Sequence, residues 1–141
     1  MCNTSGYEHA ETIRAYAKYV DVYLTDFKYD SDARSDAARR YSHAPDYFEV
    51  ATAALDAMVE CAGAPTWNSK TGDRLLSGVV VRHLLLPSRL EDSKRILAHL
   101  WSRYGTSVLY SIMNQYTPIS SHPHAPELDR ATTAEEYDQL L

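Results

Sequence analysis

The stretch GVVVRHLLLP at residues 78–87 constrains the fold of this chain more than any other. Its β-branched and aliphatic residues form a nearly continuous apolar run, which Arg82 and His83 interrupt and Pro87 ends. Such a run predicts a strand buried on both faces, which is typical of a parallel sheet covered by helices. We therefore expect an α/β fold.

Apolar periodicity elsewhere predicts that helices and strands alternate along the chain. Further strands are expected at 20–27 and 106–113, helices at 10–19, 47–62 and 90–104, and loops at 63–77 and 117–131. Asp46 with Glu49 three residues later has the form of a capping box before the middle helix. Thr133 and Glu136 have the same form and predict a short final helix.

The order helix, strand, helix, strand, helix, strand predicts parallel strands joined by right-handed crossovers. Three buried parallel strands would leave two open sheet edges, which proteins normally pair or cover. The chain is therefore expected to form one domain over residues 1–141 that is part of a larger sheet, namely an incomplete (β/α) barrel.

Composition restricts the classes of partner. The 14 basic and 19 acidic residues give a net charge of −5 without a basic cluster, which argues against nucleic acid or an anionic membrane as a partner. The amino terminus MCNTSGYEHA lacks the pattern of a signal peptide, so a cytoplasmic location is expected. Cys2 and Cys61 are too far apart in sequence for a local metal motif and are expected to be free thiols.

Asp26 and Lys28 are charged residues in the otherwise apolar strand DVYLTDFKYD at 21–30. Because side chains alternate along a strand, both share one face with Val22 and Leu24. They also lie at the carboxyl end of the strand, where ligands gather in βα units. One interpretation is a binding site, in which Asp26 accepts hydrogen bonds from a sugar and Lys28 meets a carboxylate or phosphate. The other is an ion pair within the protein.

Arg82 raises the same question on the strand at 78–87. A buried guanidinium needs an anionic partner, and this is either Asp26 of the neighbouring strand or a ligand carboxylate. His83 points to the opposite face, toward the covering helices, and is expected to be a hydrogen-bonded packing residue with no catalytic role.

Weaker candidates lie beyond the last strand. Gln115 is placed to orient a substrate at the strand end, next to Met113 at the mouth of the site. His122 and His124 lack a third ligand at a recognised spacing, so no metal site is expected there. The sequence contains no Gly-rich phosphate loop, no G-x-S-x-G and no H-E-x-x-H.

Several blocks of the sequence, taken in order, resemble the radical SAM proteins related to pyruvate formate-lyase activating enzyme. They are NTSGYE (3–8), VDVYLTDFKY (20–29), YSHAPDYFEVA (41–51), GVVVRHLLLP (78–87), LEDSKRIL (90–97) and MNQYTP (113–118). The resemblance covers essentially all 141 residues. It implies a partial barrel of the radical SAM type, in which a [4Fe-4S] cluster cleaves S-adenosylmethionine. The resulting deoxyadenosyl radical takes a hydrogen atom from a substrate, which in activating enzymes is a glycine of a partner protein.

The resemblance also implies roles for individual residues. Asp26 and Lys28 match the strand motif that contacts S-adenosylmethionine, with Asp26 near the ribose or a bound cation and Lys28 near the polar end. Arg82 matches the arginine of the following strand, and Asn3 and Thr4 match the end of the preceding strand.

Three positions depart from the family pattern. Activating enzymes carry an acidic residue where this chain has Asn3, which weakens a cation site. Gln115 and Tyr116 stand near the position of a family histidine that approaches the cofactor. Ser88 stands where the family has glycine after the proline.

The cysteine motif C-x-x-x-C-x-x-C, whose thiolates hold the iron–sulfur cluster in the family, is absent from this sequence. The chain is therefore expected to correspond to the carboxyl-terminal half of the barrel and to be inactive alone. Its expected role is to supply contacts to S-adenosylmethionine.

Two other functions are compatible with the sequence. The chain could be a non-catalytic module that pairs an open sheet edge with a polypeptide supplying the missing half-barrel, or with a second copy of itself. Lys28 could alternatively form a Schiff base in an aldolase-like barrel.

Overall fold

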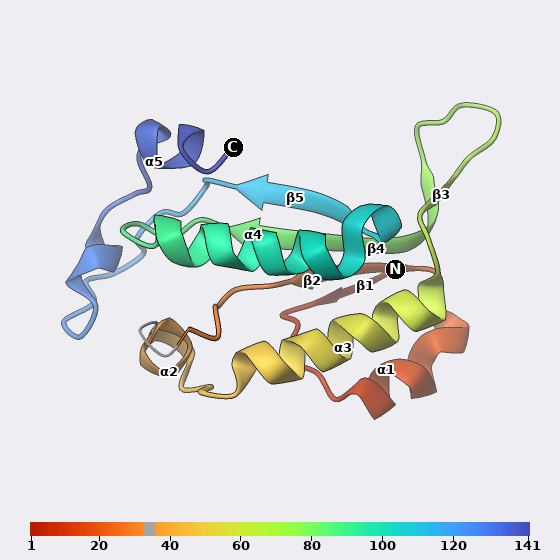
Figure 1. Cartoon of the computed structure of the whole chain (residues 1–141), viewed down its shortest axis with the longest axis horizontal. Coiled ribbons are helices and arrows are strands. Elements are labelled where there is room, and N and C mark those ends of the chain that lie inside the picture. The colour runs from red at the N-terminus through yellow and green to blue at the C-terminus, as the bar shows by residue number, and fades with distance from the viewer. Residues whose placement is uncertain (33–35) are drawn as a thin grey trace.

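The computed structural model describes residues 1–32 and 36–141 and contains a five-stranded sheet (Figure 1). The strands are β1 (Cys2–Thr4), β2 (Val22–Asp26), β3 (Thr66–Trp67), β4 (Leu75–Leu84) and β5 (Leu109–Met113). β1, β2, β4 and β5 are parallel neighbours in that order, and β3 pairs antiparallel with the first residues of β4. The expected α/β class is confirmed, whereas closure into a barrel stays a prediction.

Helices connect the parallel strands, and one further helix follows β5. They are α1 (Ala10–Tyr16), α2 (Ala37–Ser42), α3 (Tyr47–Ala62), α4 (Leu90–Tyr104) and α5 (Ala134–Asp138), with short 3-10 turns at Ala17–Tyr19, Gly105–Ser107 and Pro126–Asp129. Figure 1 shows α3 and α4 on the same side of the sheet, with α1 beside α3. The expected capping box of Thr133 and Glu136 is present at α5.

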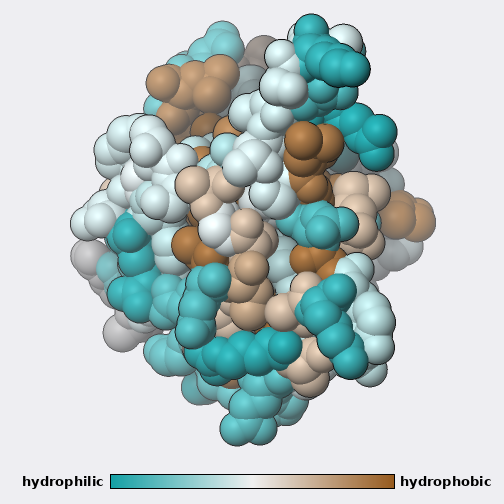
Figure 2. Space-filling view, turned by 90° about the vertical axis from the view of Figure 1, so that its right-hand side faces the viewer, coloured by the Kyte–Doolittle hydropathy of each residue, from teal (hydrophilic) through white to brown (hydrophobic). Residues whose placement is uncertain are grey.

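The core lies between the sheet and these helices. Tyr23 of β2 and Val79 and Val81 of β4 are at most 1% exposed, and they pack against buried residues of α3 and α4 such as Leu55 and Leu100. Hydrophobic side chains at the end of the molecule where β3 lies occur instead as small groups separated by hydrophilic ones (Figure 2).

The expectation that β4 is buried on both faces is wrong. Val79, Val81 and His83 are buried toward the helices, whereas Val80, Arg82 and Leu84 on the opposite face are only half-buried. The reason is that α1, α3 and α4 gather on one side of the sheet (Figure 1). The second face of the sheet, which we call the open face, therefore carries the charged residues of β2 and β4.

Three local predictions need correction. The predicted loop at 63–77 contains β3 and the first residues of β4, because Thr66 and Trp67 pair with Leu75–Ser77. The sheet has a fourth parallel strand, β1, which is only three residues long and too short to show periodicity. Asp46 does begin α3, but its carboxylate accepts a hydrogen bond from the Tyr7 hydroxyl (2.7 Å) and caps no helix N–H.

Gly6 offers a test of the packing between β1 and β2. Its φ is +83°, and a Cβ there would overlap the carbonyl oxygen of Asp26. Gly6→Ala should lower the free energy of unfolding by about 2–4 kcal/mol, because both strain and overlap are introduced. Gly72 is a matched control, since its φ is +66° but nothing lies within 4 Å of an added Cβ. In urea unfolding, equal losses for Gly6→Ala and Gly72→Ala would contradict this packing.

His83 should make folding stability depend on pH. It is 2% exposed, and burial lowers its pKa below the ordinary value. Below about pH 6.5 the imidazole of His83 is protonated in the unfolded chain but stays neutral in the folded one. The free energy of unfolding therefore falls as the pH falls. The slope contributed by one such group reaches about 1.4 kcal/mol per pH unit. Unfolding measured between pH 7 and 5 should give a shallower slope of stability against pH for His83→Asn than for wild type, and equal slopes would contradict this effect of burial.

Candidate functional site

Charged side chains from three neighbouring strands meet at the carboxyl ends of β1, β2 and β4. Asp26 and Arg82 are direct partners in the register of β2 and β4. Arg82 Nε donates a hydrogen bond to Asp26 Oδ1 (2.8 Å), and Nη2 forms an ion pair with the same oxygen at 2.7 Å. Nη2 also donates to Asn3 Oδ1 at 2.7 Å. The structure therefore brings Asn3, Asp26 and Arg82 together on the open face, and Asp26 is the anionic partner of Arg82, which is one of the two alternatives that the sequence left open.

Lys28 completes this cluster but is held loosely. Its Nζ lies 3.8 Å from Asp26 Oδ2, and its side chain is 40% exposed, against 25% for Asp26 and 26% for Arg82. One carboxylate thus faces two cations, so the cluster has an excess positive charge of one. A partly exposed ammonium with an ion-pair distance this long can turn to an anionic ligand at little cost.

Thr4, by contrast, is not part of the cluster. Its hydroxyl donates to Glu8 Oε1 (2.6 Å) and accepts a hydrogen bond from the Gly6 N–H (3.2 Å). Because side chains alternate along β1, Thr4 lies on the face opposite to Asn3. Of the five residues expected to contact the cofactor, four lie together and Thr4 lies apart.

A hollow of about 370 Å³ adjoins the cluster. Its walls are Asp26, Lys28, Tyr29, Arg82, Leu84, Leu86, Met113, Gln115 and Tyr116. One side is therefore charged and the other aliphatic and aromatic, a combination that suits a ligand with a polar and an apolar part. Met113 and Gln115 line this hollow, as the sequence predicted for the mouth of the site.

Tyr47 positions the ends of β1 and β2, a role that the sequence did not reveal. It is the first residue of α3, is 2% exposed, and sends its hydroxyl to the strand ends. The hydroxyl donates to the Ser5 carbonyl (2.8 Å), accepts from the Lys28 N–H (3.1 Å) and lies 3.1 Å from the Asp26 carbonyl. A tyrosine at a helix start gives no sequence signal that distinguishes this role from packing.

The histidines contribute to structure. His83 Nδ1 lies 2.7 Å from the Phe27 carbonyl and Nε2 lies 2.8 Å from Ser93 Oγ, which confirms it as a satisfied packing residue under the helices. His122 Nδ1 lies 3.0 Å from Asp129 Oδ1. Among the residues that the structure describes, no group of three His, Cys, Asp or Glu side chains could hold a metal ion.

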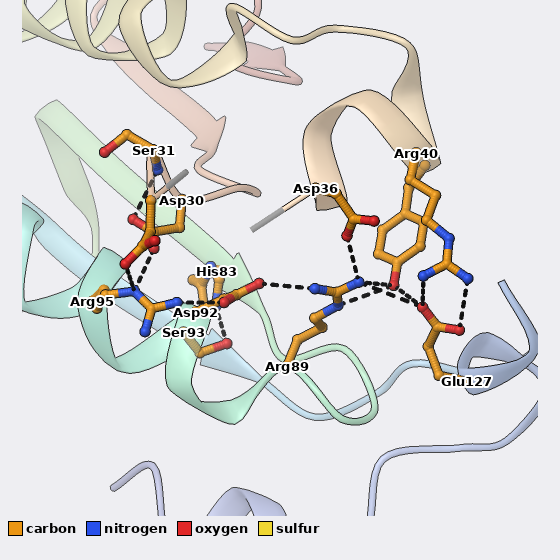
Figure 3. Close-up of polar contacts among 12 residues, drawn as sticks. Asp30, Ser31, Asp36, Arg40, His83, Arg89, Asp92, Ser93, Arg95 and Glu127 are labelled. Carbon is orange, nitrogen blue, oxygen red and sulfur yellow. Dashed lines mark hydrogen bonds and ion pairs between the residues drawn. The ribbon is translucent and has the colours of Figure 1, made fainter. Parts of the chain in front are cut away.

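An ion network borders the site at the start of α4. Figure 3 shows Arg89 between Asp36, Asp92 and Glu127. Its Nη2 donates to Asp36 Oδ1 (3.0 Å) and to the Tyr41 hydroxyl (2.8 Å), and Tyr41 donates in turn to Glu127. Burial, together with the hydrogen bond to Glu127, raises the pKa of Tyr41 to about 12. The phenol therefore stays neutral near pH 7, and the network ties the carboxyl-terminal segment to α2 and α4.

A [4Fe-4S] cluster does not fit the residues present. Such a cluster is held by thiolates, and the chain has two cysteines, Cys2 on β1 and Cys61 on α3. Cys2 pairs with Tyr23, nearer the amino ends of the strands than Asp26. Cys2 adjoins Asn3 on β1, but because side chains alternate along a strand, its thiol lies on the opposite face and packs against the core, away from the charged cluster.

The chain is similar in sequence to a curated archaeal protein. The uncharacterized protein MJ0674 of Methanocaldococcus jannaschii is 25% identical over 141 residues, which is 99% of this chain and 36% of the relative. The chain thus spans about a third of that protein's length. No protein-family model matches the chain, and no solved structure does. No helix of the described residues has the length and apolar character needed to cross a membrane.

Tyr47→Phe tests whether this hydroxyl positions the site. Loss of its hydrogen bonds should lower the free energy of unfolding by about 1–2 kcal/mol and should loosen the backbone at Ser5 and Lys28. Tyr110→Phe is a matched control, because its hydroxyl donates to the carbonyls of Leu100 and Gly105, away from the cluster. Both variants should lose stability in thermal unfolding, but only Tyr47→Phe should shift the NMR resonances of Ser5 and Lys28. Shifts of equal size in the control would contradict the positioning role.

Proposed function

We propose that this chain supplies part of the S-adenosylmethionine-binding surface of a radical SAM-type enzyme. The observation that carries the proposal is the cluster of Asn3, Asp26, Lys28 and Arg82 on the open face, at the carboxyl ends of parallel strands beside a hollow. Ligands of α/β proteins bind at this end of the strands. The sequence resemblance independently assigns these same residues to this ligand.

The chemistry of the hollow suits the parts of S-adenosylmethionine. Lys28 offers an ammonium for the methionine carboxylate, and Asp26 offers acceptor oxygens for the ribose hydroxyls. Leu84, Leu86 and Met113 offer an apolar wall for the adenine. Arg82 holds Asp26 in place from the neighbouring strand, so the carboxylate is oriented before a ligand arrives.

The reductive cleavage of S-adenosylmethionine is not assigned to this chain. The cleavage needs an iron–sulfur cluster, which the two cysteines of this chain do not fit. Thiolates of another protein segment would have to hold that cluster. The chain alone should therefore bind the ligand without cleaving it. Deoxyadenosine formed above background, after iron–sulfur reconstitution with dithionite, would contradict this part of the proposal.

A second candidate function is a non-catalytic module that pairs its sheet edge with another polypeptide or with a second copy. It is favoured by the position of β1 at the edge of the sheet, where a further strand can pair, and by the half-buried apolar residues Val22, Leu24 and Val80 on the open face. Light scattering tests the homo-oligomeric form, and a monomer that persists at high concentration would argue against it.

Lys28→Gln tests the binding of S-adenosylmethionine. Loss of the ammonium should weaken the affinity of the purified chain, measured by isothermal titration calorimetry, by about tenfold, the equivalent of about 1.4 kcal/mol. Lys70→Gln is a matched control, since Lys70 is an exposed lysine in the β3–β4 loop. No binding to the folded wild-type chain, or equal affinities of the two variants, would contradict the proposal.

A further inference from the structure

A second hollow, of about 410 Å³, lies beside the first. Its walls include Tyr29, Arg40, Tyr41, Leu86, Tyr116 and Ser121. Tyr29, Leu86 and Tyr116 line both hollows. The two therefore form one groove with a charged compartment at the strand ends and a second compartment under the segment 121–125.

The tyrosines of the second compartment have their polar ends occupied. The Tyr29 hydroxyl is hydrogen-bonded to Ser42 Oγ (2.6 Å). The Tyr116 hydroxyl donates to the Leu128 carbonyl (2.9 Å). The Tyr41 hydroxyl accepts from Arg89 and donates to Glu127. The rings, rather than the hydroxyls, are thus what these residues offer to a ligand. Aromatic rings bind other rings by stacked or edge-to-face contact.

The charge in this second compartment is neutralised, in contrast to that of the first. Arg40 Nη1 lies 2.8 Å from Glu127 Oε1, and its Nε donates to the His124 carbonyl at 2.6 Å. In the first compartment Lys28 and Arg82 outnumber Asp26. A negatively charged ligand group is therefore favoured at the strand ends, and an uncharged ring is favoured in the compartment beyond Tyr116.

We propose that the second compartment binds the neutral aromatic ring of a small-molecule substrate, whose remaining atoms extend past Tyr29 and Tyr116 toward the first compartment. Its volume of about 410 Å³ is ample for one substituted ring. The assignment of this ligand as the substrate rests on the proposed function, whereas ring binding itself does not.

Phenol and cyclohexanol, which have similar size but differ in aromaticity, are the probes. Saturation-transfer NMR titrations of the full chain should show phenol binding more tightly. Ser121→Trp, at an exposed residue that lines the compartment, should fill it and weaken phenol binding by about tenfold or more, the equivalent of about 1.4 kcal/mol. Ser120→Trp is the matched control at the neighbouring exposed position outside the lining, and it should leave the affinity within about twofold.

Three outcomes would overturn the inference: no phenol binding to wild type, equal binding of cyclohexanol, or equal loss in both tryptophan variants. Circular dichroism of the variants verifies that each is folded. Lys28→Gln separates the two proposals, because it should weaken S-adenosylmethionine and leave phenol unaffected. If phenol binds and Ser121→Trp abolishes it while S-adenosylmethionine never binds, the aromatic compartment stands and the proposed function fails.

Discussion

Strand β4 and its alternating side chains are the constraint on which the rest of the structure depends. β4 forms hydrogen-bonded pairs with β2, β5 and β3, so it organises the whole sheet. Burial of Val79 and Val81 against the helices is the apolar driving force for this arrangement. Once that face is packed, Arg82 has to emerge on the open face, because successive residues of a strand point to opposite sides.

The position of Arg82 on the open face explains the composition of the site. A guanidinium on a half-buried face needs an anion, and Asp26 stands directly opposite in the register of β2 and β4. Asn3 Oδ1 of β1 accepts a hydrogen bond from Arg82 Nη2, while Lys28 Nζ lies 3.8 Å from the Asp26 carboxylate. The cluster therefore stabilises the strand ends and also leaves one positive charge in excess, which can attract an anionic ligand.

The carboxyl-terminal segment enlarges this surface into a groove. Glu127 accepts hydrogen bonds from Tyr41 and Arg40 of α2, and Thr132 Oγ1 donates to the Leu85 carbonyl (2.9 Å). These contacts hold the segment against the carboxyl ends of the strands, where Tyr116 and Leu86 separate the charged compartment from the aromatic one. The groove thus depends on polar contacts among segments that are far apart in the sequence.

The sequence by itself determined the α/β class, the main helices and the longer strands, since apolar periodicity and cap residues are local signals. It also determined that Asp26, Lys28 and Arg82 share a face with apolar neighbours, because alternation along a strand follows from backbone geometry alone. Only the tertiary structure decided that the helices gather on one side of the sheet, that Asn3 joins the cluster while Thr4 turns away, and that Tyr47 binds the strand ends. These features depend on strand register and on contacts between distant segments, such as the 2.8 Å hydrogen bond from Tyr47 to Ser5, and no local pattern encodes such contacts.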